Sequence, residues 1–152
     1  MQSILFIVNP ISGSGRKDAA LKAVERYLDR DRFAAEIRNT EYAGHGAEIA
    51  REAAARGVDI VVAVGGDGTV NEIAGSLVDT ETALAIIPCG SGNGLARHLQ
   101  IPMDPVAAVK VINTAAIVRL DHGTINGRPF FCTCGVGFDA FISMKFAEAG
   151  RR

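Results

Sequence analysis

The sequence lacks three features that would have narrowed its function at once. Its formal net charge is only −1, so it has no excess of Lys and Arg for a nucleic-acid surface, and we expect no nucleic-acid partner. No stretch approaches the roughly 20 apolar residues needed to cross a bilayer. The apolar run at 3–8 follows no basic segment and stops at Asn9-Pro10, which is typical of a strand and not of a signal peptide.

Cysteine is also scarce, and two common catalytic motifs are missing. Three cysteines, an odd number without a secretory signal, favour free thiols in a reducing compartment, so the cytoplasm is the expected location. Cys89 has no recognisable catalytic partner and is expected to be a small buried hydrophobe. No Gly-Lys-Ser/Thr segment is present, which excludes a Walker A loop, and no Gly-x-Ser-x-Gly elbow surrounds Ser91.

What the chain does have is an alternation of apolar strands and amphipathic helices. Hydrophobic residues make up 48% of the sequence, enough for a globular core. Strands are predicted over 3–8, 33–39, 59–63 and 83–87, and helices over 16–29, 44–56, 73–77 and 104–113. Strands that are each followed by a helix predict a parallel α/β sheet, which binds ligands at the carboxyl edge of its strands.

The pattern changes after residue 114. Residues 116–125 alternate, Asn126-Gly127 predicts a type I′ hairpin turn, and 128–134 continue as a strand before a helix over 138–149. We therefore divide the chain into an α/β domain, 1–114, and the incomplete start of a β-rich second domain, 115–152.

The most informative stretch is Val64 to Glu72. Glycines at 65, 66 and 68 follow a strand and would let the backbone reach positive φ and let a ligand approach closely. Free N–H groups at the start of a helix favour an anion, although the lone carboxylate of Asp67 would repel phosphate unless a cation or a transferable proton mediates. Alternatively, Thr69 and Glu72 form a capping box and Asp67 satisfies turn amides. The capping role is expected, but it leaves the three glycines unexplained, so a phosphate site is favoured.

Three other loops are predicted at the same edge of the sheet. The first contains Asn9, Pro10, Ser12 and Gly13, the second begins at Thr40, and the fourth runs from Pro88 to Arg97 with Ser91, Gly92 and Asn93. Small hydroxyl and glycine residues in three of the four loops suit phosphate. Phosphoryl transfer needs positioning and neutralisation of phosphate charge, usually with magnesium.

These segments together resemble the diacylglycerol kinase catalytic domain family, which includes bacterial lipid kinases and the sphingosine and ceramide kinases. The resemblance is carried by Gly65 to Glu72, by Asn9-Pro10-x-Ser12-Gly13, by Thr40 with the following Gly44-His45-Gly46, and by Pro88-x-Gly90-Ser91-x-Asn93. Gly46 stands where the family usually has alanine, and Gly94 where many members have Asp. His45, in the first turn of a helix, is expected to be a structural donor.

The resemblance implies a fold, an activity and a set of ligands. The fold is a three-layer Rossmann-like parallel sheet followed by a β-sandwich domain, and the activity is ATP-dependent phosphorylation of a lipid hydroxyl with Mg²⁺. Implied partners are the nucleotide, a diacylglycerol or sphingoid-like lipid, the inner membrane face in transient contact, and a second copy in a homodimer. Asp67 would be catalytic, coordinating magnesium or accepting the hydroxyl proton. The nucleotide-binding residues would be Asn9, Pro10, Ser12, Gly13, Thr40, Gly65, Gly66, Asp67, Gly68, Thr69, Asn71, Glu72, Ser91, Gly92 and Asn93.

Two alternatives stay open at this point. Gly-Gly-Asp-Gly-Thr is shared with NAD kinases, so a small-molecule kinase of that kind is one, although Asn71-Glu72 favours the lipid kinases. The other is a truncated, non-catalytic fragment that only binds nucleotide, because the resemblance covers about half of a complete family member.

Overall fold

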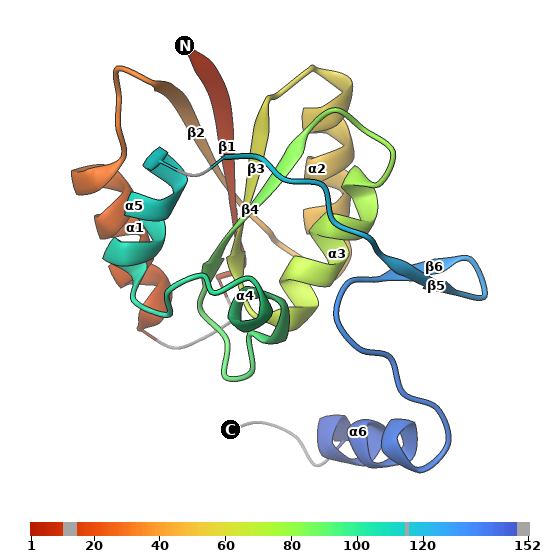
Figure 1. Cartoon of the computed structure of the whole chain (residues 1–152). Helices are drawn as coiled ribbons and strands as arrows, with labels where there is room; N and C mark the ends of the chain where they lie inside the picture. Colours follow the sequence, from red (N-terminus) through yellow and green to blue (C-terminus); the bar gives the residue numbers. More distant parts are fainter. Residues whose placement is uncertain (11–14, 115, 149–152) are drawn as a thin grey trace.

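The computed structural model describes residues 1–10, 15–114 and 116–148, and its centre is a four-stranded parallel sheet (Figure 1). The strands are β1 (Gln2–Val8), β2 (Phe33–Asn39), β3 (Ile60–Gly65) and β4 (Ala83–Pro88), in the order β2-β1-β3-β4. The register pairs Val8 of β1 with Val64 of β3, and Gly65 of β3 with Pro88 of β4. The carboxyl ends of these three strands therefore reach the same edge, which confirms the predicted parallel α/β sheet.

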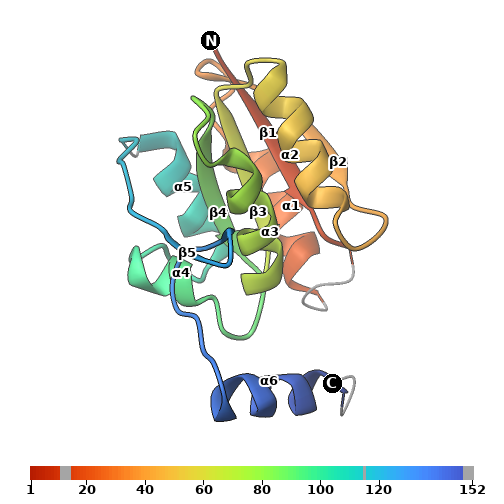
Figure 2. The same cartoon turned by 90° about the vertical axis from the view of Figure 1, so that its right-hand side faces the viewer.

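Helices cover both faces of the sheet (Figures 1 and 2). On one face lie α1 (Arg16–Tyr27) and α5 (Pro105–Thr114), which pack against each other; on the other lie α2 (His45–Ala55) and α3 (Asp67–Leu77). A fifth helix, α4 (Gly94–His98), follows β4. Because both faces are covered, β1, β3 and β4 are largely continuous apolar runs, whereas the edge strand β2 also carries polar residues and is mostly exposed or half-buried.

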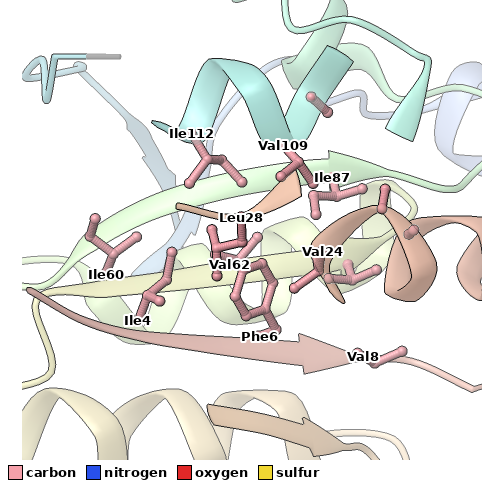
Figure 3. Packing of buried hydrophobic residues seen from close by; sticks show 14 of the residues in the cluster. Ile4, Phe6, Val8, Val24, Leu28, Ile60, Val62, Ile87, Val109 and Ile112 are labelled. Atoms are coloured by element: carbon pink, nitrogen blue, oxygen red, sulfur yellow. The ribbon is translucent and has the colours of Figure 1, made fainter. Parts of the chain in front are cut away.

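Two separate cores result from this arrangement. Alternate side chains of the strands point to opposite faces. Ile4, Phe6 and Val8 of β1 join the core beneath α1 and α5 (Figure 3), and Leu5 and Ile7 join the core beneath α2 and α3. All five of these side chains are at most 1% exposed, and every residue of the neighbouring strand β3 is also buried, so these two strands form the buried centre of the sheet.

Most element boundaries of the α/β part match the predicted ones, but α4 falls largely in the predicted loop 88–97 and α3 begins earlier than predicted. α3 begins at Asp67, six residues before the predicted start at Ile73, because the Val70 amide donates to the Gly66 carbonyl and turns the glycine-rich stretch into the first helical turn. The predicted cap of α5 is confirmed, since the Ala107 amide donates to Asp104 Oδ2 at 2.8 Å.

The hairpin is confirmed but is shorter than predicted. β5 (Gly123–Ile125) pairs antiparallel with β6 (Arg128–Phe130), and Asn126 and Gly127 have φ of 49° and 73°, as a type I′ turn requires. The predicted strands, 116–125 and 128–134, extend further. Pro129 cannot donate a ladder hydrogen bond, and an uncovered two-stranded ribbon is only marginally stable.

The segment after α5 is rich in exposed apolar side chains. Helix α6 (Phe138–Glu148) lies apart from the sheet in both views (Figures 1 and 2), and the predicted end of this helix, Ala149, falls outside the described residues. Phe138 is 74% exposed and Phe141 50%. Within the described ranges, no helix has the length and apolar character needed to span a membrane.

We expect these exposed rings to make the protein self-associate as its concentration rises. Replacing Phe138 and Phe141 together by serine should reduce the association measured by light scattering across a dilution series, because it removes apolar surface that water hydrates unfavourably. Ile37→Ser is the matched control, since Ile37 is also exposed but lies on β2. A wild-type protein that stays monomeric at every concentration contradicts this expectation.

Candidate functional site

Two glycine-rich loops cross in contact at the carboxyl edge of β3 and β4. None of Gly65, Gly66 and Gly68 has a positive φ, so the predicted need for left-handed backbone at these positions is wrong. Close approach explains two of them. A Cβ on Gly65 would lie 2.6 Å from Thr69 Oγ1, and a Cβ on Gly90 would lie 2.6 Å from Gly66 Cα. The Cys89 amide also donates to the Gly65 carbonyl at 2.8 Å, which fixes the two loops to each other.

Gly68 differs from its neighbours because nothing in the described chain crowds it. A Cβ built there meets no atom within 4 Å, and the residue is exposed in the first turn of α3. Internal packing therefore does not account for glycine at this position, and the surface above it is open.

Asp67 connects the two loops through its carboxylate. Oδ2 accepts the Asn93 amide at 2.7 Å and Oδ1 accepts the Gly94 amide at 2.6 Å. The alternative that Asp67 satisfies backbone amides is thus correct, although the amides belong to the loop after β4 and not to its own turn. Gly92 makes room for this arrangement, because a Cβ there would lie 2.6 Å from Asp67 Oδ2.

Asn93 is a structural residue of the second loop. It is 4% exposed and adopts left-handed backbone with φ 55°, a conformation that Asn tolerates better than most residues. Its Oδ1 accepts the Gly90 amide at 2.9 Å and its Nδ2 donates to the Gly90 carbonyl at 2.7 Å. Ser91 and Gly92, which lie between Gly90 and Asn93 in this loop, are exposed.

Thr69 and Glu72 do not form the predicted capping box. Helix α3 starts three residues earlier than that motif requires, so both side chains bond elsewhere. Thr69 Oγ1 accepts from Asn9 Nδ2 at 3.2 Å, and Glu72 Oε1 accepts the Ala47 amide at 3.1 Å, which caps the first turn of α2. Gly46 allows this contact, because a Cβ there would lie 2.8 Å from Glu72 Oε1.

The remaining predicted residues divide between the edge of the sheet and the surface. Thr40 is buried directly after β2, and its amide donates to the Val8 carbonyl at 2.9 Å. Asn71 and Pro10 are exposed, whereas Ser12 and Gly13 lie outside the described residues. His45 is structural but as an acceptor, not the expected donor, since its Nδ1 accepts the Glu41 amide at 3.1 Å.

Two arginines at this edge were missed by the sequence reasoning. Arg16 Nη1 donates to the Gly90 carbonyl at 3.2 Å, and Arg97 Nε donates to the Gly92 carbonyl at 2.7 Å. Arg16 begins α1, directly after the first small-residue loop, and Arg97 lies in α4. A basic residue immediately after such a loop was the available signal for the first.

The acidic and thiol groups of the site are few. Among the described residues, no three or more His, Cys, Asp or Glu side chains gather as a metal site would require. Burial raises the pKa of the Cys89 thiol, and this residue is only 1% exposed, as expected for a small hydrophobe. Cys132 and Cys134 are free and exposed.

A pocket of about 220 Å³ is formed by residues of α4 and of the hairpin region. Its lining is partly polar and partly aromatic, formed by His98, Asp121, His122, Gly123, Phe130, Phe131 and Cys132. Gly94 separates it from Asp67, since a Cβ on Gly94 would lie 3.4 Å from Cys132 Sγ and 3.6 Å from Asp67 Oδ1.

The fold and this edge define a class of protein. In an open parallel sheet of the order β2-β1-β3-β4, the helix that follows β1 and the helix that follows β3 cover opposite faces of the sheet. Such α/β domains bind ligands in the crevice at the carboxyl ends of these two neighbouring strands. The family model for the diacylglycerol kinase catalytic domain matches residues 3–125, and the chain belongs to that family.

Individual relatives agree with this assignment. The chain is 39% identical over 134 residues to a Chromohalobacter salexigens protein named "Probable lipid kinase YegS-like", covering 84% of this chain and 43% of the relative. It is 36% identical over 141 residues to a diacylglycerol kinase of Bacillus subtilis, covering 90% and 46%. A crystal structure of a diacylglycerol kinase from Bacillus anthracis superimposes with a TM-score of 0.74 at 30% identity, covering 85% and 48%. The chain thus spans less than half the length of these relatives.

The role of Glu72 as the cap of α2 leads to a stability prediction. Glu72→Ala should lower the free energy of unfolding by about 1 kcal/mol, because it removes a favourable charge at a helix N-terminus and one of the two acceptors of the Ala47 amide, which also donates to the Gly44 carbonyl at 3.1 Å. Glu72→Gln should lose less, since it keeps an acceptor oxygen. Urea denaturation measures both. Asn71→Ala, an exposed neighbour on α3, is the control, and equal stability of Glu72→Ala and wild type would exclude the cap.

Proposed function

We propose that this chain binds ATP at the carboxyl edge of its sheet and belongs to an enzyme that transfers the γ-phosphate to a lipid hydroxyl. The observation that carries the proposal is Gly68. Its two neighbours, Gly65 and Gly66, are explained by contacts inside the chain, whereas Gly68 faces open space on the first turn of a helix. Glycine is a poor helix former, so a ligand that approaches the backbone here is the physical reason for it.

The surroundings of Gly68 suit a phosphate chain. α1 and α3 both begin at this edge, and among the residues that the structure describes, neither N-cap makes a side-chain hydrogen bond. Amide N–H groups at helix starts, together with the basic side chains of Arg16 and Arg97, attract anions. Asn9, Thr69 and Asn93 support the loops through hydrogen bonds, so their proposed role is to hold the nucleotide site in shape and not to contact every phosphate.

The transfer itself requires a nucleophile, a leaving group and a destination for one proton. The lipid hydroxyl oxygen bonds to the γ-phosphorus, and the bond from that phosphorus to the bridging oxygen breaks, which releases ADP. We assign the hydroxyl proton to the carboxylate of Asp67. Its two oxygens already accept backbone amides, but each oxygen of an ionised carboxylate has a second acceptor position.

Magnesium is expected to enter with the nucleotide. Mg²⁺ usually keeps several waters and is held by one or two carboxylates together with substrate phosphates, so a single protein carboxylate suffices. In the alternative role that the resemblance implies for Asp67, its carboxylate would hold the ion instead of taking the proton. When bound, the ion would neutralise phosphate charge, and the residues of this chain position the nucleotide beside it.

The acceptor and the cellular setting are proposed from family membership. Relatives named diacylglycerol kinase and lipid kinase favour a diacylglycerol or sphingoid-like acceptor over the NAD of the alternative kinase class. We place the protein in the cytoplasm with transient contact to the inner membrane face, where such an acceptor is reached. Because the chain spans less than half of its relatives, turnover is assigned to the whole protein and nucleotide binding to this chain.

Substitution of Gly68 tests nucleotide binding directly. Gly68→Val should weaken ATP binding in the presence of magnesium at least tenfold by calorimetry, because its side chain occupies the space proposed for the ligand. Its melting temperature should stay unchanged, since a Cβ at position 68 meets no atom of the described residues within 4 Å. Gly75→Ala on the same helix, where a Cβ meets only Pro129 Cγ at 3.3 Å, is the control. Unchanged affinity in Gly68→Val would remove this loop from the site.

Asp67→Asn separates a structural from a chemical role in the whole protein. In the variant, the NH₂ group faces one of the two backbone N–H groups from which the wild-type carboxylate accepts a hydrogen bond. That bond is lost, so the variant should lose about 1 kcal/mol of stability and some nucleotide affinity. Phosphate transfer at saturating ATP should fall by roughly 100-fold or more if the carboxylate also takes the proton. Thermal melting, ATP binding and phosphate transfer are measured on one sample. If the rate of phosphate transfer falls by no more than the ATP affinity does, Asp67 is a purely structural residue.

A further inference from the structure

Two guanidinium groups from different helices reach the loop after β4. Arg16 comes from the start of α1 and donates Nη1 to the Gly90 carbonyl at 3.2 Å. Arg97 comes from α4 and donates Nε to the Gly92 carbonyl at 2.7 Å. The exposed residue between these two carbonyls is Ser91, so the arginines bracket the tip of this loop.

The bonds neutralise an obstacle to anion binding. Carbonyl oxygens carry partial negative charge and would repel a phosphate that approaches the loop. Each carbonyl here is instead bonded to a cationic group, and a guanidinium has five N–H donors in a planar fork, of which each recorded bond uses one. The donors that remain suit the planar, bidentate recognition of phosphate oxygens.

The charges around the pair leave the loop net positive. The carboxylate of Asp67 is the negative group bonded to this loop, and its two oxygens accept the Asn93 and Gly94 amides. Its single negative charge is outweighed by the two guanidinium groups. Asp18 lies two residues after Arg16 on α1, a spacing that places the two side chains on different sides of a helix. The guanidinium of Arg16 also acts on the base of the loop, since its charge opposes the rise in the pKa of the Cys89 thiol that burial causes.

We infer that Arg16 and Arg97 form a phosphate clamp that binds the polyphosphate chain of the nucleotide over the loop at 90–92. The inference rests on the proposed function and assigns its phosphate contacts to two particular side chains. The clamp acts on the phosphate chain alone, so it should bind a free polyphosphate as well as a nucleotide, and it should not contribute to binding of the nucleoside.

Glutamine variants distinguish the clamp from a mere loop support. Gln at 16 or 97 keeps an N–H that can donate to the loop carbonyl but removes the charge and the fork. We expect Arg16→Gln and Arg97→Gln each to weaken ATP and inorganic tripolyphosphate about tenfold, and the double variant about 100-fold, as the loss of charged hydrogen bonds predicts. Adenosine affinity should stay the same, and the salt dependence of ATP binding should become shallower.

Calorimetry on the full chain with ATP, tripolyphosphate and adenosine makes the measurement, with melting temperature recorded for every variant. Arg26→Gln is the matched control, because Arg26 lies in the last turn of α1, at the opposite end from Arg16, with its guanidinium over the Tyr27 ring. Its ATP and tripolyphosphate affinities should equal those of wild type.

The outcomes separate the clamp from the proposed function. ATP and tripolyphosphate binding that is undiminished in both glutamine variants overturns the clamp and leaves the nucleotide site standing. A loss shared equally by adenosine and accompanied by a lower melting temperature also overturns it, since the arginines then only support the loop. Tripolyphosphate binding without ATP binding supports the clamp and removes the nucleotide proposal. Binding of neither overturns both.

Discussion

The carboxylate of Asp67, bonded to the amides of Asn93 and Gly94, is the interaction on which the candidate site depends. It joins the loops that follow two neighbouring strands, and two glycines of the second loop serve that junction. Gly92 leaves space for the carboxylate, while Gly90 lets the backbone of one loop touch that of the other. Leaving the partly buried Asn93 amide without an acceptor would be costly, so the carboxylate helps to hold the second loop in shape, together with the bond from the Cys89 amide to the Gly65 carbonyl.

The first turn and a half of α3 extends the same junction to the other loops. Thr69 accepts from Asn9 after β1, and Glu72 accepts the Ala47 amide at the start of α2. One short helical segment therefore contacts the loops or helices that follow each of β1, β2 and β4. The parallel register makes this possible, since it brings the ends of these strands to one edge above two well-filled cores.

The sequence predicted the layers well and the contacts of the site poorly. Apolar runs identified β1, β3 and β4, because a sheet covered on both faces excludes polar residues from its centre. Weak alternation identified the edge strand β2, which has the predicted bounds 33–39. The start of α3 was missed because glycines have low helix propensity, which a tertiary junction overrides. The partners of Asp67 and Glu72 lie 26 and 25 residues away, a distance that no local pattern reveals. The roles of the nucleotide-binding residues, Ser12 and Gly13 included, stay predictions.

The space at Gly46 couples the effects of substitutions at two positions. Glycine at 46 weakens the intrinsic stability of α2 but lets the Glu72 carboxylate reach the Ala47 amide. With alanine at 46, the carboxylate has to withdraw from its present place, since a Cβ would lie 2.8 Å from it. The effect of a mutation at either position therefore depends on the residue at the other, so the two substitutions are not additive.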